Sequence, residues 1–308
     1  MQYAPIAVFV YNRADHAKST IEALAKCPEA TNSDLYVFSD GAKNESGKAK
    51  VDAVREYLRE VSGQNYFKSV KITESEKNKG LAASIIEGVS RVLEIHGKII
   101  VVEDDCIASP HFLKFMNACL DQYENDKQIG SIAGYAPPIQ FENDYAHDIF
   151  LAYRSCSWGW ATWKNRWDGI DWKLQNFSQF CSQPDNIKRL NCNGNDRFIR
   201  LYRQTKGDGS SWSVRFGAHH ALNNWLVVYP KYSYISNIGC DESGVHSQKK
   251  DEAKIRVNLN NSIAEPNIEK PQLDARIQKE LYRFYSGGLL SRVKRSFANR
   301  FILVRKNR

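Results

Sequence analysis

The chain lacks both a paired cysteine pattern and a long hydrophobic run. Its seven cysteines are scattered over 308 residues with no CxxC pair. This spacing argues against a disulfide framework or a zinc knuckle and favours a reducing compartment. No stretch approaches the roughly 20 apolar residues that span a bilayer. The apolar run 4–10 has no basic segment before it and is too short for a signal sequence. We therefore expect a cytoplasmic protein.

Acidic residues are absent from 281–308, which holds eight basic residues and accounts for the whole formal net charge of +8. Apolar residues recur in this segment at spacings of three and four: Leu290, Val293, Phe297, Phe301 and Val304. A helix here would carry an apolar stripe beside a basic face. Residues 289–308 are thus predicted to bind an anionic membrane surface, peripherally at the inner membrane face. A solvated tail and a helix docked on its own domain remain open. Nucleic acid is not expected as a partner, because the rest of the chain has no charge excess.

Strand-like and helix-like segments alternate along the first 123 residues. Predicted strands cover 5–11, 34–39, 67–73 and 98–102, and predicted helices cover 15–24, 48–62, 81–95 and 110–123. Asp15 is the expected cap of the first helix. This rhythm predicts βαβ units, and hence an α/β protein with a mixed, mainly parallel sheet flanked by helices. Ligands bind such sheets outside the carboxyl ends of the strands. Polar residues that follow three different strands should therefore converge on one crevice.

The most informative stretch is 98–106, where an apolar, β-branched run leads into Glu103, Asp104 and Asp105. An all-apolar strand is typical of one that is buried on both faces. Three carboxylates at its end would repel one another, and burial would raise their pKa values. A divalent cation bound by these hard oxygens, with phosphate as its other ligand, would compensate them. The alternative is that the acids only open a solvated loop.

Several motifs follow one another between residues 4 and 247. They are Asn12-Arg13, Ser39-Asp40-Gly41, Asn78-Lys79-Gly80-Leu81, Val101-Val102-Glu103-Asp104-Asp105, Ser109-Pro110-His111-Phe112, Ser157-Trp158-Gly159-Trp160-Ala161-Thr162-Trp163, Asn237-Ile238-Gly239-Cys240-Asp241 and Gly244-Val245-His246. In this order they resemble GT-A-fold glycosyltransferases, and most of all the N-acetylglucosaminyltransferase I-like enzymes and related bacterial sugar transferases. The ordered set is more specific for the fold than for the sugar. The basic tail lies outside it.

The resemblance implies a donor site in the predicted crevice. Arg13 would bind the diphosphate or the uracil edge, and Asp40 would accept the uracil N–H. Lys79 and Gly80 precede a helix, so their amides would face a phosphate. Simpler readings remain open, with Arg13 at a sheet edge, Asp40 in a turn and the glycine at a plain helix start.

The resemblance also implies roles in the acidic cluster and in a late loop. Glu103 and Asp104 would lie near the ribose and the donor sugar. Asp105 would bind Mn²⁺ or Mg²⁺ directly, and His246 would be a metal or phosphate ligand. Imidazole suits manganese better than magnesium. A lone loop histidine is more often solvated.

Five of the seven tryptophans lie between residues 158 and 172. Aromatic faces stack well on sugar rings, so Trp158, Gly159 and Trp160 are predicted to line the acceptor or sugar pocket. Core packing is the alternative, and we expect it to take the larger share with one tryptophan at the site.

The candidate catalytic base is predicted from a position at which this chain differs from related sequences. In related sequences an Asp stands just before the Ser-Trp of a segment like 211–216, but this chain has Ser210 there. We therefore expect Asp208 to be the base that deprotonates the acceptor hydroxyl, with Asp196 as the second candidate. Asp208 could instead be only a turn residue.

These observations together predict a GT-A domain over residues 1–250 and a C-terminal extension, with the basic tail, over 251–308. Residues 1–107 would bind the nucleotide sugar, and 108–250 would bind the acceptor. The predicted activity is an inverting, metal-dependent transfer of a sugar from a UDP-sugar to a hydroxyl of a glycan or lipid-linked acceptor, as in surface-polysaccharide synthesis. Two alternatives are a non-catalytic saccharide-binding protein and a nucleotidyltransferase of similar fold. The latter usually carries a glycine-rich loop after the first strand, and residues 11–15 contain no glycine.

Overall fold

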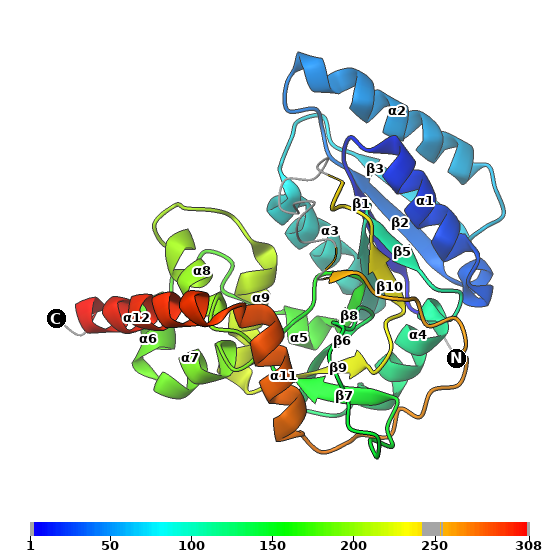
Figure 1. Cartoon of the computed structure of the whole chain (residues 1–308). Helices are drawn as coiled ribbons and strands as arrows, with labels where there is room; N and C mark the ends of the chain where they lie inside the picture. Colours follow the sequence, from blue (N-terminus) through cyan, green and yellow to red (C-terminus); the bar gives the residue numbers. More distant parts are fainter. Residues whose placement is uncertain (1–2, 242–252, 254, 307–308) are drawn as a thin grey trace.

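The computed structural model describes residues 3–241, 253 and 255–306, without the side chains of 300, 301 and 303–306. Its centre is an eight-stranded sheet in the order β3-β2-β1-β4-β8-β6-β9-β7, and β10 pairs with β5 in a separate two-stranded ribbon (Figure 1). The strands are β1 (Ile6–Val10), β2 (Asp34–Ser39), β3 (Ser69–Glu74), β4 (Lys98–Glu103), β5 (Cys106–Ala108), β6 (Ile129–Ala133), β7 (Ile149–Ala152), β8 (Trp160–Trp163), β9 (Leu226–Pro230) and β10 (Ile235–Asn237).

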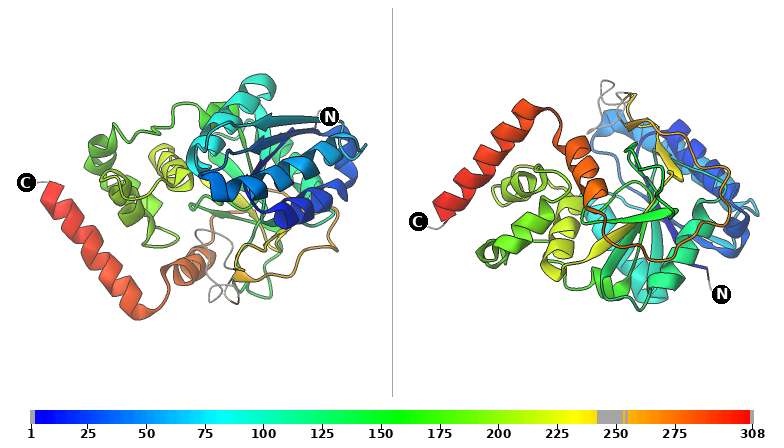
Figure 2. Two further views of the ribbon diagram at one scale, coloured as in Figure 1. Left: turned by 90° about the horizontal axis from the view of Figure 1, so that it is seen from above. Right: turned by 60° about the horizontal axis from the view of Figure 1, so that its bottom comes forward.

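Helices cover both faces of this sheet and form a separate group at one side of it (Figures 1 and 2). The helices are α1 (Ala14–Ala25), α2 (Glu45–Ser62), α3 (Leu81–His96), α4 (Phe112–Tyr123), α5 (Lys164–Trp167), α6 (Phe177–Ser182), α7 (Pro184–Leu190), α8 (Arg197–Gln204), α9 (Trp212–Asn223), α11 (Ala275–Ser286) and α12 (Leu289–Lys306), with a short 3-10 helix, η1 (Pro28–Asn32).

The sheet is mixed but mainly parallel. β3, β2, β1 and β4 are parallel neighbours. β8 is antiparallel to β4 and to β6, β9 is parallel to β6, and β7 is antiparallel to β9. Six of the eight strands therefore point in one direction, which confirms the predicted α/β class.

Alternate side chains of β1 and β4 belong to two different apolar clusters. Val8 and Val102 pack in one cluster with side chains of α1, α2 and α4. Phe9 and Val101 pack in the other with side chains of α3 and α9. Both strands are therefore covered on both faces, which explains why their sequences are apolar throughout.

Each predicted element of the first 123 residues is present, with ends within three residues of the prediction. The predicted Asp15 cap is wrong. Arg13 is the N-cap residue of α1, and no side chain caps that helix. Asp15 lies in the first turn instead, where the helix dipole still favours an acid.

The C-terminal segment packs against the rest of the chain. The tyrosine hydroxyls of residues 123, 135 and 234 donate hydrogen bonds to the carbonyls of Ile268, Ile255 and Ile263. Ile277 and Leu281 of α11 join the main core cluster. Within the described residues, the predicted extension 251–308 is thus attached to the domain along its length.

A buried ion pair joins the helical group to the sheet. Arg154, after β7, donates two hydrogen bonds to Asp196, before α8, at 2.8 and 3.2 Å. The Arg154 guanidinium also lies 3.9 Å from the ring centre of Tyr285 on α11. Burial raises the pKa of Asp196, but Arg154 and the arginines 197 and 200 outweigh it and hold that pKa well below its ordinary value.

We expect Asp196→Asn to lower the free energy of unfolding at pH 7 by about 3 kcal/mol, because it leaves Arg154 buried without its carboxylate. The folded pKa of Asp196 lies below the unfolded one. Its contribution is therefore complete above about pH 4 and is lost as the pH falls toward the folded value.

Urea unfolding of both proteins between about pH 6 and pH 3 tests this prediction, and the difference in stability should shrink toward pH 3. Asp168→Asn is the control, because Asp168 forms an exposed pair with Lys164 and its loss should change little. A difference that stays constant with pH would contradict the assignment.

Candidate active site

The strand order reverses between β1 and β4. From β1 the chain moves outward through β2 to β3, and then β4 pairs with the opposite side of β1. In open α/β sheets, ligands bind in the crevice outside the carboxyl ends of the strands at such a point. Arg13 follows β1 there, and Asp104 and Asp105 follow β4, since Phe9 is the register partner of Glu103.

Arg13 is paired with the acidic cluster. Its guanidinium donates through Nη2 to both Asp104 and Asp105, at 2.9 Å for Asp105 Oδ2, and through Nε to Asp104 Oδ2 at 3.3 Å. Arg13 therefore supplies part of the positive charge that the sequence analysis expected from a divalent cation. Its own pKa is lowered by burial, but Asp104 and Asp105 outweigh this and raise it.

The three carboxylates at the end of β4 differ in their surroundings. Burial raises the pKa of Asp104, although Arg13 partly offsets this. Burial, Asp105 and Asp104 together raise the pKa of Glu103 well above its ordinary value. Within the described residues, no hydrogen bond or ion pair engages the Glu103 side chain, so Arg13 neutralises its neighbours and not Glu103 itself.

The other side of Asp105 contacts a segment that is distant in sequence. Antiparallel pairing of β10 with β5 sets Asn237 opposite Cys106. Asn237 Nδ2 donates to Asp105 Oδ1 at 2.9 Å, and the amide of Ile238 donates to the Asp105 carbonyl at 2.8 Å. A Cβ atom on Gly239 would lie 2.3 Å from Asp105 Oδ2, so a larger residue there would force the Asp105 carboxylate to move.

Two further polar residues adjoin the cluster from α1. His16 Nε2 lies 3.3 Å from Asp241 Oδ2, and Thr20 donates to the Asp104 carbonyl at 2.8 Å. The sequence analysis did not identify His16 or Thr20, and it named Asn237 within a motif without giving it a role. The sequence held a signal for His16 and Thr20, because these positions are four residues apart and share one face of the predicted helix 15–24.

The residues present can be tested against a divalent cation. Hard carboxylate oxygens suit Mg²⁺ or Mn²⁺, and Asp105 and Glu103 supply such oxygens beside the crevice. No group of three or more His, Cys, Asp or Glu side chains in the described part of the chain is arranged to hold a metal ion. A cation on Asp105 would thus need ligands from a bound diphosphate or from elsewhere. The other predicted ligand, His246, lies outside the described residues.

Asp40 organises the loop after β2. Its carboxylate accepts from the amides of Gly41, Lys79 and Gly80 and from Asn78 Nδ2, at 2.8–3.1 Å. The Lys79 and Gly80 amides, which were expected to face a phosphate, thus bind Asp40 instead. The Lys79 ammonium pairs with Glu87. Gly80 has φ 77°, a conformation that favours glycine.

The predicted tryptophan pocket needs correction. Trp160 is 1% exposed and stacks on Trp167 and Trp212 in the core, so it cannot line a sugar pocket. Gly159 has φ 57° and packs against Ile235, where a Cβ would lie 2.5 Å from that side chain. Only Trp158 of the three keeps partial exposure, and it packs edge-on against Tyr135.

The two candidate bases have contrasting environments. Asp208 has a side chain that is 72% exposed and lies 3.8 Å from Arg203. Asp196 is held by Arg154, and its lowered pKa makes it a poor proton acceptor. In the described contacts, neither carboxylate touches the acidic cluster.

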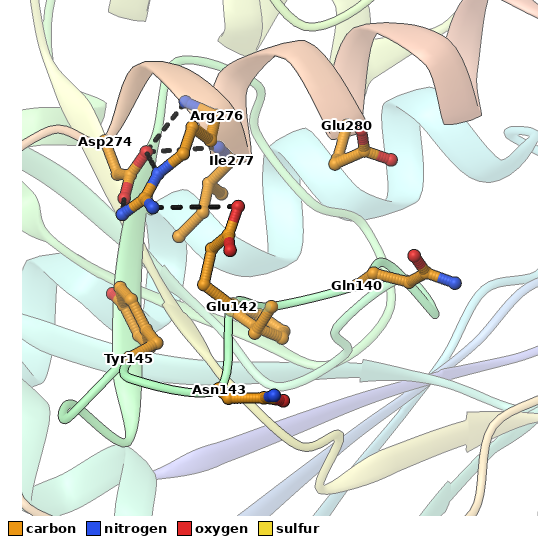
Figure 3. Close-up of a pocket in the computed structure, with 9 residues that line it drawn as sticks. Gln140, Glu142, Asn143, Tyr145, Asp274, Arg276, Ile277 and Glu280 are labelled. Atoms are coloured by element: carbon orange, nitrogen blue, oxygen red, sulfur yellow. Dashed lines mark hydrogen bonds and ion pairs between the residues drawn. The ribbon is translucent and has the colours of Figure 1, made fainter.

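Two cavities are lined by other residues than those predicted for the site. One, of about 260 Å³, lies between residues 140–145 and the start of α11. Figure 3 shows Arg276 directed there toward Asp274 and Glu142, with which it forms ion pairs. The other, of about 160 Å³, lies against α6 and α9.

Of three comparisons with known proteins, only the search of solved structures finds matches. No protein-family model and no curated protein matches it. Among solved structures it is similar to a crystal structure of S. aureus TarS, at 13% identity and TM-score 0.43, over 78% of this chain and 37% of that one. It is also similar to S. aureus TarS 1-349, at 12% identity and TM-score 0.43, over 76% of this chain and 59% of that one. The chain thus spans less than two thirds of either structure. The fold class follows from the strand order and the helix layers alone.

We expect Glu103→Gln to stabilise the protein at neutral pH. A raised pKa means that the folded state holds this proton more tightly than the unfolded state. Stability is therefore lost as the pH rises above the ordinary value of 4.5. Glutamine removes that loss, so the variant should exceed the wild type by about 1 kcal/mol near pH 7.5.

Denaturant unfolding near pH 7.5 and pH 4 measures this effect, and the gain should disappear at the lower pH. Glu56→Gln, on the exposed side of α2, is the matched control. A destabilised Glu103→Gln near pH 7.5 would show that the ionised carboxylate supports the fold.

Proposed function

We propose that the chain is an inverting, divalent-metal-dependent glycosyltransferase that moves a sugar from a UDP-sugar to a hydroxyl of a glycan or lipid-linked acceptor. The observation that carries this proposal is the convergence of Arg13, Asp104 and Asp105 at the point where the strand order reverses. The ordered motifs that resemble N-acetylglucosaminyltransferase I-like enzymes supply the reaction class and the choice of UDP.

The donor would bind across the ends of β1, β2 and β4. Arg13 carries a planar fork of donors that matches diphosphate oxygens. Asp40 would act on the nucleoside mainly by holding the 78–80 turn in place, because its oxygens already accept several N–H groups. Glu103 and Asp104 would lie toward the ribose and the sugar.

Asp105 would hold the cation, with His246 as a further proposed ligand. A bound Mn²⁺ or Mg²⁺ would supply positive charge opposite the diphosphate as the sugar–oxygen bond breaks. Asn237 orients Asp105 through its hydrogen bond to Oδ1. Gly239 leaves the room that the other oxygen needs.

Asp208 remains the proposed base, with Asp196 second. The support for this order is that Asp208 has an exposed side chain, paired with Arg203 at 3.8 Å, whereas Asp196 is held in a buried ion pair with Arg154. The acceptor hydroxyl would lose its proton to this carboxylate as it attacks the donor sugar from the face opposite UDP. Surface-polysaccharide synthesis is the proposed setting.

Thermal unfolding with nucleotides tests the donor site. UDP or a UDP-sugar with Mn²⁺ should stabilise the wild type by about 2.7 kcal/mol at 100 times its dissociation constant. Asp105→Asn, which keeps the shape of the side chain, should abolish the Mn²⁺-dependent part. Asp168→Asn is the exposed control.

The outcomes separate three classes of protein. A shift with UDP and Mn²⁺ that disappears in Asp105→Asn supports the transferase. A shift with nucleoside triphosphates but not with UDP-sugars would favour a nucleotidyltransferase. A shift with saccharides and no nucleotide would favour a saccharide-binding protein and would refute the proposal.

Steady-state kinetics tests the base. With the UDP-sugar that stabilises most, Asp208→Asn should lower kcat for UDP release by about 100-fold or more and leave KM nearly unchanged. Asp185→Asn, at an exposed position of α7, is the control. The assignment is reversed if Asp196→Asn remains folded and lowers kcat by about 100-fold, while Asp208→Asn leaves kcat unchanged.

A further inference from the structure

Among its described side chains, helix α12 contacts the rest of the chain through one face. Asn195 Nδ2 donates to the Arg292 carbonyl at 3.0 Å, and Asn299 Nδ2 donates to the Asn195 carbonyl at 3.2 Å. Ile302 joins the apolar cluster of helices α6–α9. Figures 1 and 2 show α12 lying across the outside of this helical group, at the edge of the molecule. The inner face is thus polar at one end and apolar at Ile302.

The outer face of α12 is apolar and exposed. Its large side chains and their exposed fractions are Leu289 74%, Leu290 78%, Val293 45% and Phe297 69%. Residues 290, 293 and 297 follow the three- and four-residue spacing of one helix face. These four residues form the outer face of α12. Exposed apolar side chains that cluster in this way are unusual on a monomeric soluble protein and are typical of an interaction site.

The positive charge of the C-terminal segment indicates which partner the outer face of α12 would bind. Lys294 is exposed beside the outer face, and 281–308 holds eight basic residues and no acid, while the remainder of the chain is formally neutral. A second copy would bring two such segments together, and their like charges would repel. Nucleic acid would leave Leu290 and Phe297 without an apolar partner. An anionic bilayer offers both negative headgroups and an acyl boundary.

We propose that the outer face of α12 binds the surface of an anionic phospholipid bilayer, with the helix lying in the plane of the interface. Leu290, Val293 and Phe297 would enter the acyl boundary, and Lys294 would meet the headgroups. Among the described residues, no helix combines the length and the apolar content needed to span a bilayer. The proposal does not depend on the donor site.

Co-sedimentation of the full chain with vesicles tests the proposal. The protein should bind vesicles of phosphatidylcholine mixed with phosphatidylglycerol, bind phosphatidylcholine alone much more weakly, and dissociate as salt is raised. The double variant Leu290→Glu, Phe297→Glu should reduce partitioning at least tenfold, because both apolar side chains are lost. Lys294→Ala should reduce it about fivefold.

The matched control is the double variant Ile95→Glu, Leu222→Glu, which removes two exposed apolar side chains from α3 and α9 and should leave vesicle binding unchanged. Circular dichroism and the nucleotide-induced shift report folding and donor binding separately. Equal binding to neutral and anionic vesicles, or no effect of the α12 variant, would overturn the proposal. So would a wild-type dimer in solution that the α12 variant converts to a monomer, since a second copy would then cover this face.

Discussion

Three consecutive carboxylates at the end of a buried strand impose the central constraint on this structure. β4 is apolar on both faces, so the chain cannot turn its acidic end away from the sheet without losing the core. Arg13 lies at the end of the neighbouring strand and partly neutralises these carboxylates by pairing with Asp104 and Asp105. The parallel pairing of β1 with β4 is thus stabilised by packing along the strands and by charge at their ends. Leaving Arg13 or the acids unpaired there would be strongly destabilising.

The elements of the first half were predictable because their signals are local. Apolar runs, helical spacing and glycine at chain reversals predict strands and helices without any knowledge of contacts. The pairing of Arg13 with Asp104 joins residues 91 positions apart and depends on strand order, which no local pattern encodes. The same holds for Asn237, which reaches Asp105 only through the β10–β5 ribbon. Trp160 was predicted to line the sugar pocket but lies in the core. A tryptophan can stack on a sugar ring or on other aromatic side chains, and the sequence does not distinguish these two roles.

Asp40 was predicted to bind the nucleoside, and in the structure its carboxylate holds the 78–80 turn. An Asp-Gly pair after a strand is expected at a ligand site and also in a turn. Here the carboxylate binds three amides and one side chain, so it fixes the loop that borders the crevice. Glu103 differs, because it has a raised pKa and no described partner. Residues that cost stability in this way are typical of functional sites. The two acids therefore differ in their partners: Asp40 is engaged by the 78–80 turn, whereas Glu103 has no hydrogen bond or ion pair among the described residues.

The charge balance at the ends of β1 and β4 bears directly on the proposed metal dependence. Arg13 is the only cationic side chain shown in contact with the acidic cluster among the described residues, and it already serves two carboxylates. A diphosphate that entered alone would add negative charge beside Asp105 and would have to compete with Asp104 for the guanidinium. The proposed divalent cation would remove this conflict, because it would attract Asp105 and the phosphate oxygens at once. In the proposed donor complex, the acids that make the unliganded cluster unfavourable would also make binding of the diphosphate depend on the cation.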